Sequence, residues 1–309
     1  MRKTFALVFN ARAGVARPKL LDGVLARLKA AGATVFAVPA RSAEEAALRV
    51  AELAQTKDAD AVIAAGGDGT FRAVATGAAG SELPVGFLPL GTGNVLAYEL
   101  GLRKHAPDLA TGLLEHPAIP VQGGLVNGQP FFLMAGAGHD ARIVQGLNYK
   151  TKRMLGRAAY TQPVIDALIE RPQMFDIDVD GRSLQASWAI ITRASHYGGS
   201  FVLTRETRLG EAPMIAVIVA AKSRTQLLRA SAALALGWIA NPARRPPGVS
   251  VLPARHVRMG LAVTVPLQVD GDEAGATPAN IVAEGPIVRI IVPPAYAADL
   301  TKCHTNHLL

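Results

Sequence analysis

The chain has 309 residues, 32 Lys and Arg against 24 Asp and Glu, a formal net charge of +8 and one cysteine. This length accommodates one large domain or two ordinary ones, and a single cysteine excludes a disulfide framework or a zinc site built from several cysteines. The longest uncharged segment that could be helical, residues 230–243, is shorter than the roughly 18 residues that span a bilayer. The apolar run within residues 1–10 is too short for a signal peptide. We therefore expect a globular, cytoplasmic protein from a reducing compartment.

Positive charge is concentrated in two windows that contain no acidic residue, 141–165 and 212–269. Together they hold twelve basic residues, so the rest of the chain has a net charge of −4. One interpretation is a set of solvated surface charges without a dedicated partner. The other is a basic face that contacts an anionic membrane surface transiently. No nucleic acid is expected as a partner, because the basic segments lack interleaved aromatic residues and a known docking motif.

The first part of the chain alternates short apolar strands with helical segments. Strands are predicted over residues 5–9, 34–38, 60–64 and 84–88, and helices over 18–31, 43–55, 70–79 and from about 94. Ser42 and Glu45 predict a capping box at the second helix. Apolar strands separated by helices are typical of a doubly wound parallel sheet, in which ligands bind at the carboxyl ends of the strands.

The second part, from about Gly123, is mostly β. Strands are predicted over residues 131–134, 175–179, 188–192, 214–220, 263–265 and 288–292, and helices near 158–170 and 225–240. Asp180-Gly181 is typical of a hairpin turn. We therefore expect an α/β domain over residues 1–122 and a second, β-rich domain over 123–292.

Two glycine-rich turns follow adjacent strands of the predicted parallel sheet. The first is Gly66-Gly67-Asp68-Gly69-Thr70, and the second is Gly91-Thr92-Gly93-Asn94. Glycines let backbone N–H groups approach an oxyanion closely, and the helix that follows adds positive potential suited to phosphate. A tight turn beside a helix cap is the alternative, although such a turn does not need this density of glycine.

These motifs resemble the diacylglycerol kinase catalytic-domain family, in its soluble bacterial lipid kinase branch, which is related to the sphingosine kinases. The resemblance extends over almost the whole chain. Further matches are Asn10 to Gly14, Gly138 to Ala141, Leu155 to Tyr160, Tyr197 to Gly199 and Asp270 to Asp272. It implies an α/β nucleotide domain, a second domain of sandwich type that binds the lipid, and a last segment, about 293–309, that packs back on the first domain.

The resemblance also implies a site for ATP and Mg2+. The nucleotide-binding residues would be Asn10, Gly66, Gly67, Asp68, Gly69, Thr70, Arg72, Gly91, Thr92 and Asn94. Asp272 would accept the proton of the lipid hydroxyl beside Asp270, and Asp68 would help to place phosphate and metal. The Asp-Gly turn of the family's second-domain metal site is replaced here by Glu211-Ala212, so Glu211 would be the metal-binding residue of that domain.

The function that follows from this resemblance is ATP-dependent phosphorylation of a lipid hydroxyl, with diacylglycerol or a related lipid as substrate. Such an enzyme would be peripherally associated with the membrane, and a homodimer is compatible with these features. An NAD kinase-like enzyme and a catalytically silent nucleotide- or lipid-binding module are the alternatives. The second alternative draws on departures such as Val95, where much of the family has Asp.

Overall fold

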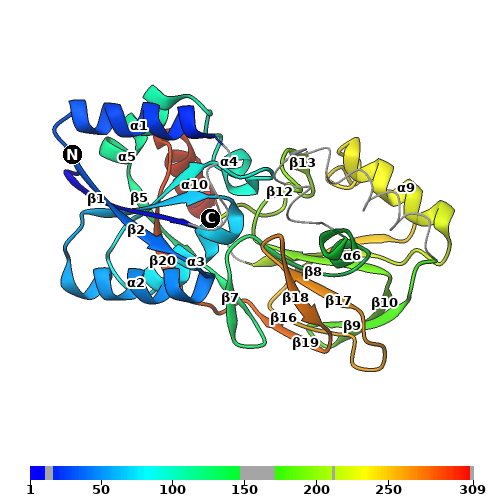
Figure 1. Ribbon diagram of the computed structural model, residues 1–309. Coiled ribbons are helices and arrows are strands. Elements are labelled where there is room, and N and C mark those ends of the chain that lie inside the picture. Colours follow the sequence, from blue (N-terminus) through cyan, green and yellow to red (C-terminus); the bar gives the residue numbers. More distant parts are fainter. Residues whose placement is uncertain (11–16, 147–170, 211–212, 307–309) are drawn as a thin grey trace. The chain divides into compact units, whose positions relative to one another are not determined.

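The computed structural model describes residues 1–10, 17–146, 171–210 and 213–306 (Figure 1). The chain forms two compact units, one of Met1–Gln122 with Pro286–Leu309 and one of Gly123–Gly285. It returns to the first unit at Pro286, earlier than the predicted return near residue 293. The reason is that strand β20 (Ile287–Ile291), expected in the second domain, pairs with strands of the first unit.

The first unit is built on a six-stranded sheet in the order β2-β1-β3-β4-β20-β5. All neighbouring strands are parallel except β5, which runs antiparallel to β20. The remaining strands are β1 (Thr4–Asn10), β2 (Thr34–Ala40), β3 (Ala61–Gly66), β4 (Val85–Pro89) and β5 (Ala118–Gln122). The central strands β3 and β4 are buried almost throughout, as expected for a sheet covered on both faces, so the predicted parallel sheet is confirmed.

Helices cover both faces of this sheet (Figure 1). Helix α1 (Pro18–Ala30) packs beside α5 (Ala106–Glu115) on one face, and α2 (Ala43–Thr56) packs beside α3 (Asp68–Ala78) on the other. The unit is completed by α4 (Val95–Glu99) and α10 (Pro294–Asn306). This arrangement is the doubly wound fold that the sequence predicted.

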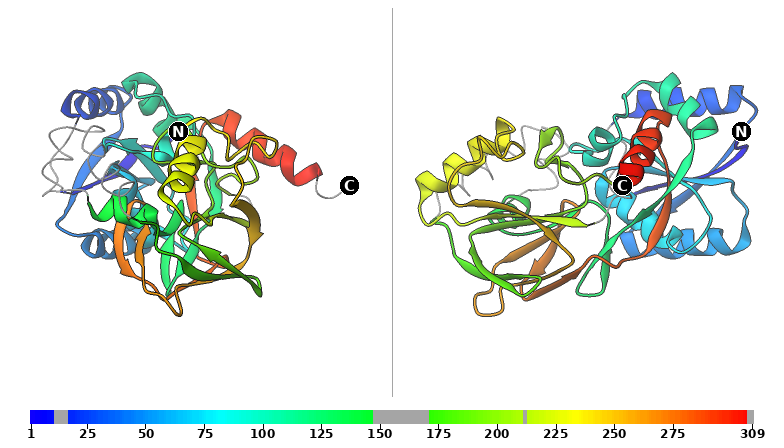
Figure 2. Two further views of the ribbon diagram at one scale, coloured as in Figure 1. Left: turned by 90° about the vertical axis from the view of Figure 1, so that its right-hand side faces the viewer. Right: turned by 180° about the vertical axis from the view of Figure 1, so that it is seen from behind.

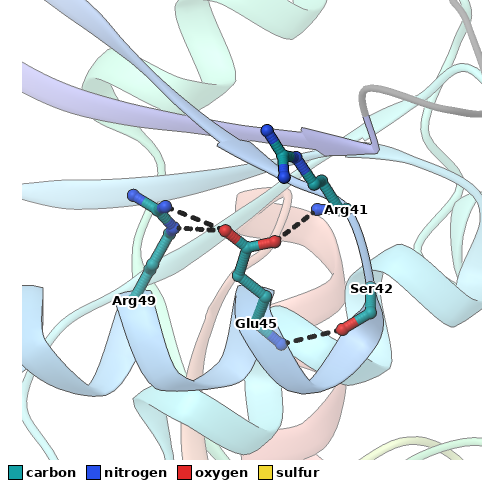
Figure 3. Close-up of polar contacts among 4 residues, drawn as sticks. All are labelled: Arg41, Ser42, Glu45 and Arg49. Carbon is teal, nitrogen blue, oxygen red and sulfur yellow. Dashed lines mark hydrogen bonds and ion pairs between the residues drawn. The ribbon is translucent and has the colours of Figure 1, made fainter.

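The start of α2 shows how the sequence fixes a helix boundary just after a strand (Figure 3). The hydroxyl of Ser42 accepts a hydrogen bond from the backbone nitrogen of Glu45 at 3.1 Å, as predicted. The Glu45 carboxylate differs from the capping-box expectation, because it accepts from the backbone nitrogen of Arg41, one residue before the cap, at 2.8 Å. Its other oxygen accepts from Arg49 one turn later. The carboxylate therefore links the residue that follows β2 to the first turns of α2.

The second unit contains two antiparallel sheets of six strands, in the orders β10-β9-β16-β19-β6-β7 and β15-β14-β11-β8-β17-β18. They enclose one apolar core that takes side chains from both sheets, including Phe131, Ile177, Ile191 and Leu267. The unit is therefore sandwich-like, as predicted. The strands are β6 (Gly124–Val126), β7 (Gln129–Phe131), β8 (Met134–Gly138), β9 (Phe175–Val179), β10 (Arg182–Ala186), β11 (Trp188–Thr192), β14 (Met214–Val219), β15 (Val249–Ala254), β16 (His256–Met259), β17 (Pro266–Val269), β18 (Asp272–Ala276) and β19 (Ala279–Val282).

Within residues 123–146, 171–210 and 213–285, two helices and a short hairpin accompany these sheets. Helices α6 (His139–Gln145) and α9 (Arg224–Ala235) lie on the outer side of the sheet that contains β8, β11 and β14 (Figures 1 and 2). The hairpin pairs β12 (His196–Tyr197) with β13 (Phe201–Val202). None of the described helices is both long and apolar enough to cross a membrane.

Several predicted elements of this unit differ in the structure. The strand expected at 131–134 is divided into β7 and β8, since the chain between them turns to donate its amides to Asp270. The strand expected at 263–265 begins later, at Pro266, and α9 ends earlier than expected, at Ala235. The helix predicted near 158–170 lies outside the described residues.

Candidate active site

The first glycine-rich loop joins β3 to α3 at the carboxyl end of the parallel sheet. Gly67 is the N-cap of α3, and the first intrahelical bond runs from the backbone nitrogen of Phe71 to the carbonyl of Gly67. The amides of Gly69 and Thr70 consequently have no acceptor within the helix. Amides at a helix start, together with its positive potential, suit an anionic group such as phosphate.

The second glycine-rich loop packs directly on the first. The backbone nitrogens of Leu90 and Gly91 both donate to the carbonyl of Gly66, at 2.9 and 3.0 Å. A Cβ at Gly91 would lie 2.6 Å from the Cα of Gly67, closer than real Cβ atoms approach. Only glycine therefore fits at residue 91, and the two loops form one continuous backbone surface.

Asp68 joins the two loops through its side chain. Its Oδ2 accepts a hydrogen bond from the backbone nitrogen of Val95 at 2.9 Å, and its Oδ1 accepts from Leu96 at 3.1 Å. These two amides open α4, where a negative charge is favoured by the helix dipole. Asp68 therefore has a structural role that the sequence did not predict, and its role toward phosphate and metal stays a prediction.

Asn94 closes the second loop in a left-handed conformation, with a φ angle of 51°. Its side chain does not cap α4, as the simple helix-cap alternative would require. Instead, its Nδ2 donates to the carbonyl of Gly91 at 2.5 Å. The Oδ1 atom of Asn94 is buried and has no hydrogen-bond partner among the residues that the structure describes. Because buried acceptors are nearly always paired, this oxygen is a candidate to accept a hydrogen bond from a bound water or ligand.

The other predicted nucleotide residues lie around these loops. Thr70 packs its side chain under Gly66, where a Cβ on the glycine would collide with the Thr70 hydroxyl. Arg72 and Thr92 are half-buried. Asn10 ends β1, but its side chain is not described, and Glu211 lies outside the described residues.

In the second unit, a turn of two residues with positive φ, Asp270 and Gly271, connects β17 to β18. The Asp270 carboxylate is buried and accepts the backbone amides of Phe132, Leu133 and Met134, each at 2.9 Å. Asp272 opens β18 and is half-buried, so its side chain remains accessible. Of the two predicted acids on this turn, Asp270 therefore anchors the backbone, and Asp272 is the more exposed.

A buried acid behind this turn was not among the predicted site residues. Asp140, in the first turn of α6, is 1% exposed and accepts hydrogen bonds from the Tyr197 hydroxyl and, at 2.7 Å, from Nε2 of Gln268. Burial raises the pKa of Asp140 to about 6, although both hydrogen bonds oppose the shift. Asp140 and Tyr197 belong to segments that carried the family resemblance, whereas nothing in the sequence singled out Gln268.

His139 lies beside this acid but is held among aromatic rings. Its ring packs edge to face on Trp188 with 5.3 Å between centroids, and Trp188 also contacts Tyr197. Burial, with a smaller contribution from Arg142, lowers the pKa of His139 to about 4. His139 is consequently neutral near pH 7 and serves as packing rather than as a base.

The donor groups near the two loops include one carboxylate, that of Asp68. Among the described residues, no three His, Cys, Asp or Glu side chains are grouped as ligands for a metal ion. Mg2+ commonly binds with one or two carboxylates, several waters and the phosphates of its substrate. A single acid on a loop whose amides suit phosphate, as Asp68 is, fits that mode of binding.

Two family profiles cover nearly all of the chain. Residues 4–126 match the diacylglycerol kinase catalytic domain, and residues 134–292 match the YegS C-terminal NAD kinase beta sandwich-like domain. The diacylglycerol kinase of Bacillus subtilis (strain 168) is 28% identical over 265 residues, which cover 84% of each chain. That of Staphylococcus carnosus (strain TM300) is 27% identical over 296 residues, covering 91% of this chain and 92% of the relative. A crystal structure of a diacylglycerol kinase from Bacillus anthracis str. Sterne has the same fold, with a TM-score of 0.69, 17% identity, and coverage of 95% and 98%.

The two matched profiles, one for each unit of the fold, place the chain among the two-domain kinases. The matched profiles and relatives identify the branch of this class. The chain belongs to the diacylglycerol kinase catalytic-domain family, and it is an ATP-dependent lipid kinase.

Proposed function

We propose that this lipid kinase phosphorylates diacylglycerol or a closely related lipid, with Asp272 as the proton acceptor. The lipid hydroxyl oxygen would form a bond to the γ-phosphorus of ATP as the bond to the bridging oxygen breaks and ADP leaves. The hydroxyl proton would pass to the carboxylate of Asp272. The observation that carries this proposal is an accessible acid on a turn that the buried Asp270 fixes through three backbone amides.

The nucleotide would bind on the two joined loops of the first unit. The amides at the start of α3 would bind phosphate oxygens, and Oδ1 of Asn94 is a candidate to accept a hydrogen bond at the same place. When bound, Mg2+ would neutralise charge on the transferring phosphoryl group. Asp68 would hold the ion through a water or directly, while its two amide contacts keep the loops together.

The membrane contact is best supported at α9. Leu228, Leu236 and Trp238 are exposed by 55%, 59% and 41% on this helix and the turn that follows it. Leu228, Ala232, Ala235 and Leu236 share one face of the helix, since they are spaced by four, three and one residues. The exposed basic residues of the same segment are Lys222, Arg224, Arg229 and Arg244, and no acid occurs between residues 212 and 269. An exposed apolar helix face with basic residues in the same segment is typical of attachment to anionic membranes.

One alternative function has an observation in its favour. The profile that matches the second unit is described as NAD kinase beta sandwich-like, so phosphorylation of NAD is a second candidate. The relatives that cover most of the chain are diacylglycerol kinases, which favours a lipid acceptor. A homodimer remains a prediction.

A transfer assay with labelled ATP separates these functions. The protein is incubated with mixed micelles that contain diacylglycerol, with other lipids that bear a hydroxyl group, and with NAD. We expect label to appear in diacylglycerol or a related lipid, and the Asp272→Asn variant to lose this transfer. Label in NAD alone would contradict a lipid acceptor, and ATP binding without transfer would identify a silent module.

A further inference from the structure

A chain of hydrogen-bonded polar side chains, buried or half-buried, leads to the turn that precedes Asp272. The Tyr197 hydroxyl donates to Oδ1 of Asp140, and Nε2 of Gln268 donates to Oδ2 of Asp140 at 2.7 Å. Oε1 of Gln268 in turn accepts from the backbone nitrogen of Gly271 at 2.9 Å. Asp140 and Gln268 are each 1% exposed, and Gly271 is the residue immediately before Asp272.

The chemistry of the carboxylate fixes the direction of these hydrogen bonds. An ionised Asp140 only accepts, so Gln268 must turn its NH2 group toward it. The carbonyl oxygen of the same amide then faces the backbone nitrogen of Gly271. If the amide of Gln268 were reversed, its oxygen would lie against the carboxylate of Asp140. Its NH2 group would then face the backbone N–H group of Gly271, so that two donors would oppose each other. Asp140 therefore determines which end of Gln268 meets the turn.

The backbone next to this pair is shaped to admit it. Gly136 lies opposite Gln268 in the pairing of β8 with β17. A Cβ at residue 136 would collide with Oδ2 of Asp140 and would lie 2.7 Å from Nε2 of Gln268. Position 268 itself lies between the buried Leu267 and Val269, where an apolar side chain would avoid the cost of burying an amide. Packing alone thus gives no reason for the acid and the amide at these positions.

We propose that Asp140 is a positioning residue that acts through Gln268 to set the position of Asp272. The turn before Asp272 is then held at two points, by the side chain of Asp270 at Phe132 to Met134 and by the side chain of Gln268 at Gly271. The role of Asp272 as proton acceptor rests on the function proposed above. Displacement of a catalytic group by about 1 Å can cost about 100-fold in rate, so a loose turn would be sufficient to impair transfer.

Reversing the polarity of the pair tests this proposal. In Gln268→Glu, two carboxylates oppose each other, and the turn loses its fixed acceptor. In the double variant Asp140→Asn/Gln268→Glu, the NH2 group of residue 140 can donate to the carboxylate of residue 268. That carboxylate can still accept from the backbone nitrogen of Gly271. The pair again carries one negative charge, as in the wild type. Gln268→Asn is a second probe, because its shorter side chain cannot reach both partners. Tyr197→Phe is the matched control that leaves the contact between residues 140 and 268 in place.

We expect Gln268→Glu and Gln268→Asn to lower kcat by about 10- to 100-fold with little change in KM for ATP, since the nucleotide loops belong to the other unit. The double variant should recover to within a few-fold of the wild type, a result that a general loss of packing would not give. The amide signal of Gly271 in nuclear magnetic resonance spectra should shift in Gln268→Glu and return in the double variant. Wild-type kcat in Gln268→Glu, or no recovery in the double variant, would overturn the proposal.

The two readouts distinguish failure of this inference from failure of the proposed function. If the wild type transfers phosphate to no lipid, the proposed function is wrong, and the Gly271 signal alone decides whether Asp140 orders the turn. An unchanged Gly271 signal in both single variants at residue 268 would overturn the positioning role. The positioning role would also be overturned if the Gly271 signal shifted in these variants while an active enzyme still transferred phosphate at the wild-type rate.

Discussion

Oδ2 of Asp68 lies 2.9 Å from the backbone nitrogen of Val95, and this hydrogen bond joins the first glycine loop to the helix that follows the second. Oδ1 of the same side chain accepts from the next amide, at Leu96. The acid that we propose to hold Mg2+ is therefore also the acid that links the two loops. Substitutions at Asp68 will consequently combine a structural effect with a catalytic one.

We predict that Asp68→Ala lowers the free energy of unfolding by about 1–3 kcal/mol, because two amides at the start of α4 lose a charged acceptor. The same variant should bind ATP at least tenfold more weakly, since the loop amides are no longer held together. Chemical denaturation and calorimetric titration with ATP measure the two effects. Asp58→Ala is the matched control, because Asp58 is exposed and lies outside both loops. Wild-type stability of Asp68→Ala would show that the two hydrogen bonds contribute little.

A second prediction separates the two acids of the Asp270 turn. Asp270→Ala should lower the free energy of unfolding by about 3–5 kcal/mol, because three backbone amides in a buried position lose their acceptor. Asp272→Asn should change stability by less than about 1 kcal/mol and lower kcat by about 100-fold or more, as expected for loss of a general base. Thermal unfolding and transfer assays on both variants make the comparison. The assignment would be reversed if Asp272→Asn unfolded the protein while Asp270→Ala kept full stability.

Much of the fold could be predicted because local patterns and topology agree. Short apolar strands alternate with helices in residues 4–115, and that pattern alone predicts the parallel sheet. The sequence does not show that β20 belongs to the first unit, because an apolar strand does not identify the strand with which it pairs. The pairing of β20 with β4 and β5 joins segments that are far apart in the sequence. The strand boundaries around residues 131–134 were also misjudged, since the amide acceptor that interrupts them, Asp270, is distant in the sequence.

The glycine loops were recognisable because their chemistry is contained in a few consecutive residues. The link between the loops could not be recognised, because the hydrogen bond from the Val95 amide to Asp68 depends on how the two loops pack. Gln268 had no distinguishing signal, since a single amide in an apolar strand is ordinary. Only the fold shows that it lies between Asp140 and Gly271.

Burial of Asp140 predicts a component of stability that depends on pH. Its pKa is raised to about 6 in the folded protein against an ordinary value of 3.8, so the folded state binds more protons than the unfolded state between these values. Stability should therefore fall as pH rises from about 4 to 6, by up to about 3 kcal/mol, and should be constant above that window. Asp140→Asn should lack this component.

Comparing the wild type with Asp140→Asn isolates this effect, because the surrounding ionisable groups are common to both proteins. They include Tyr197, which donates to Asp140, and His139 and Arg142, which lie next to it in the sequence. Urea denaturation at intervals between pH 4 and 8 gives the difference in the free energy of unfolding. Parallel pH profiles for the two proteins would show that Asp140 titrates as an ordinary exposed acid.

The final prediction concerns the exposed face of α9. Leu228→Glu and Trp238→Glu should each weaken binding to vesicles that contain anionic lipid by about tenfold, because each removes an apolar group from the bilayer interface and adds a repelled charge. Arg229→Ala should weaken binding by about fivefold, and added salt should reduce that difference. Leu48→Glu, on the exposed side of α2, and Arg182→Ala, on β10, are matched controls that should bind like the wild type.

Vesicle sedimentation measures this binding, and transfer to a short-chain lipid in detergent micelles shows that the catalytic site is intact. We expect the α9 variants to keep their activity in micelles while they lose it on vesicles. If they sediment with vesicles as the wild type does, the membrane contact is elsewhere on the protein. If the wild type is a dimer and Leu228→Glu makes it a monomer without changing vesicle binding, the face of α9 is an interface between two copies of the chain.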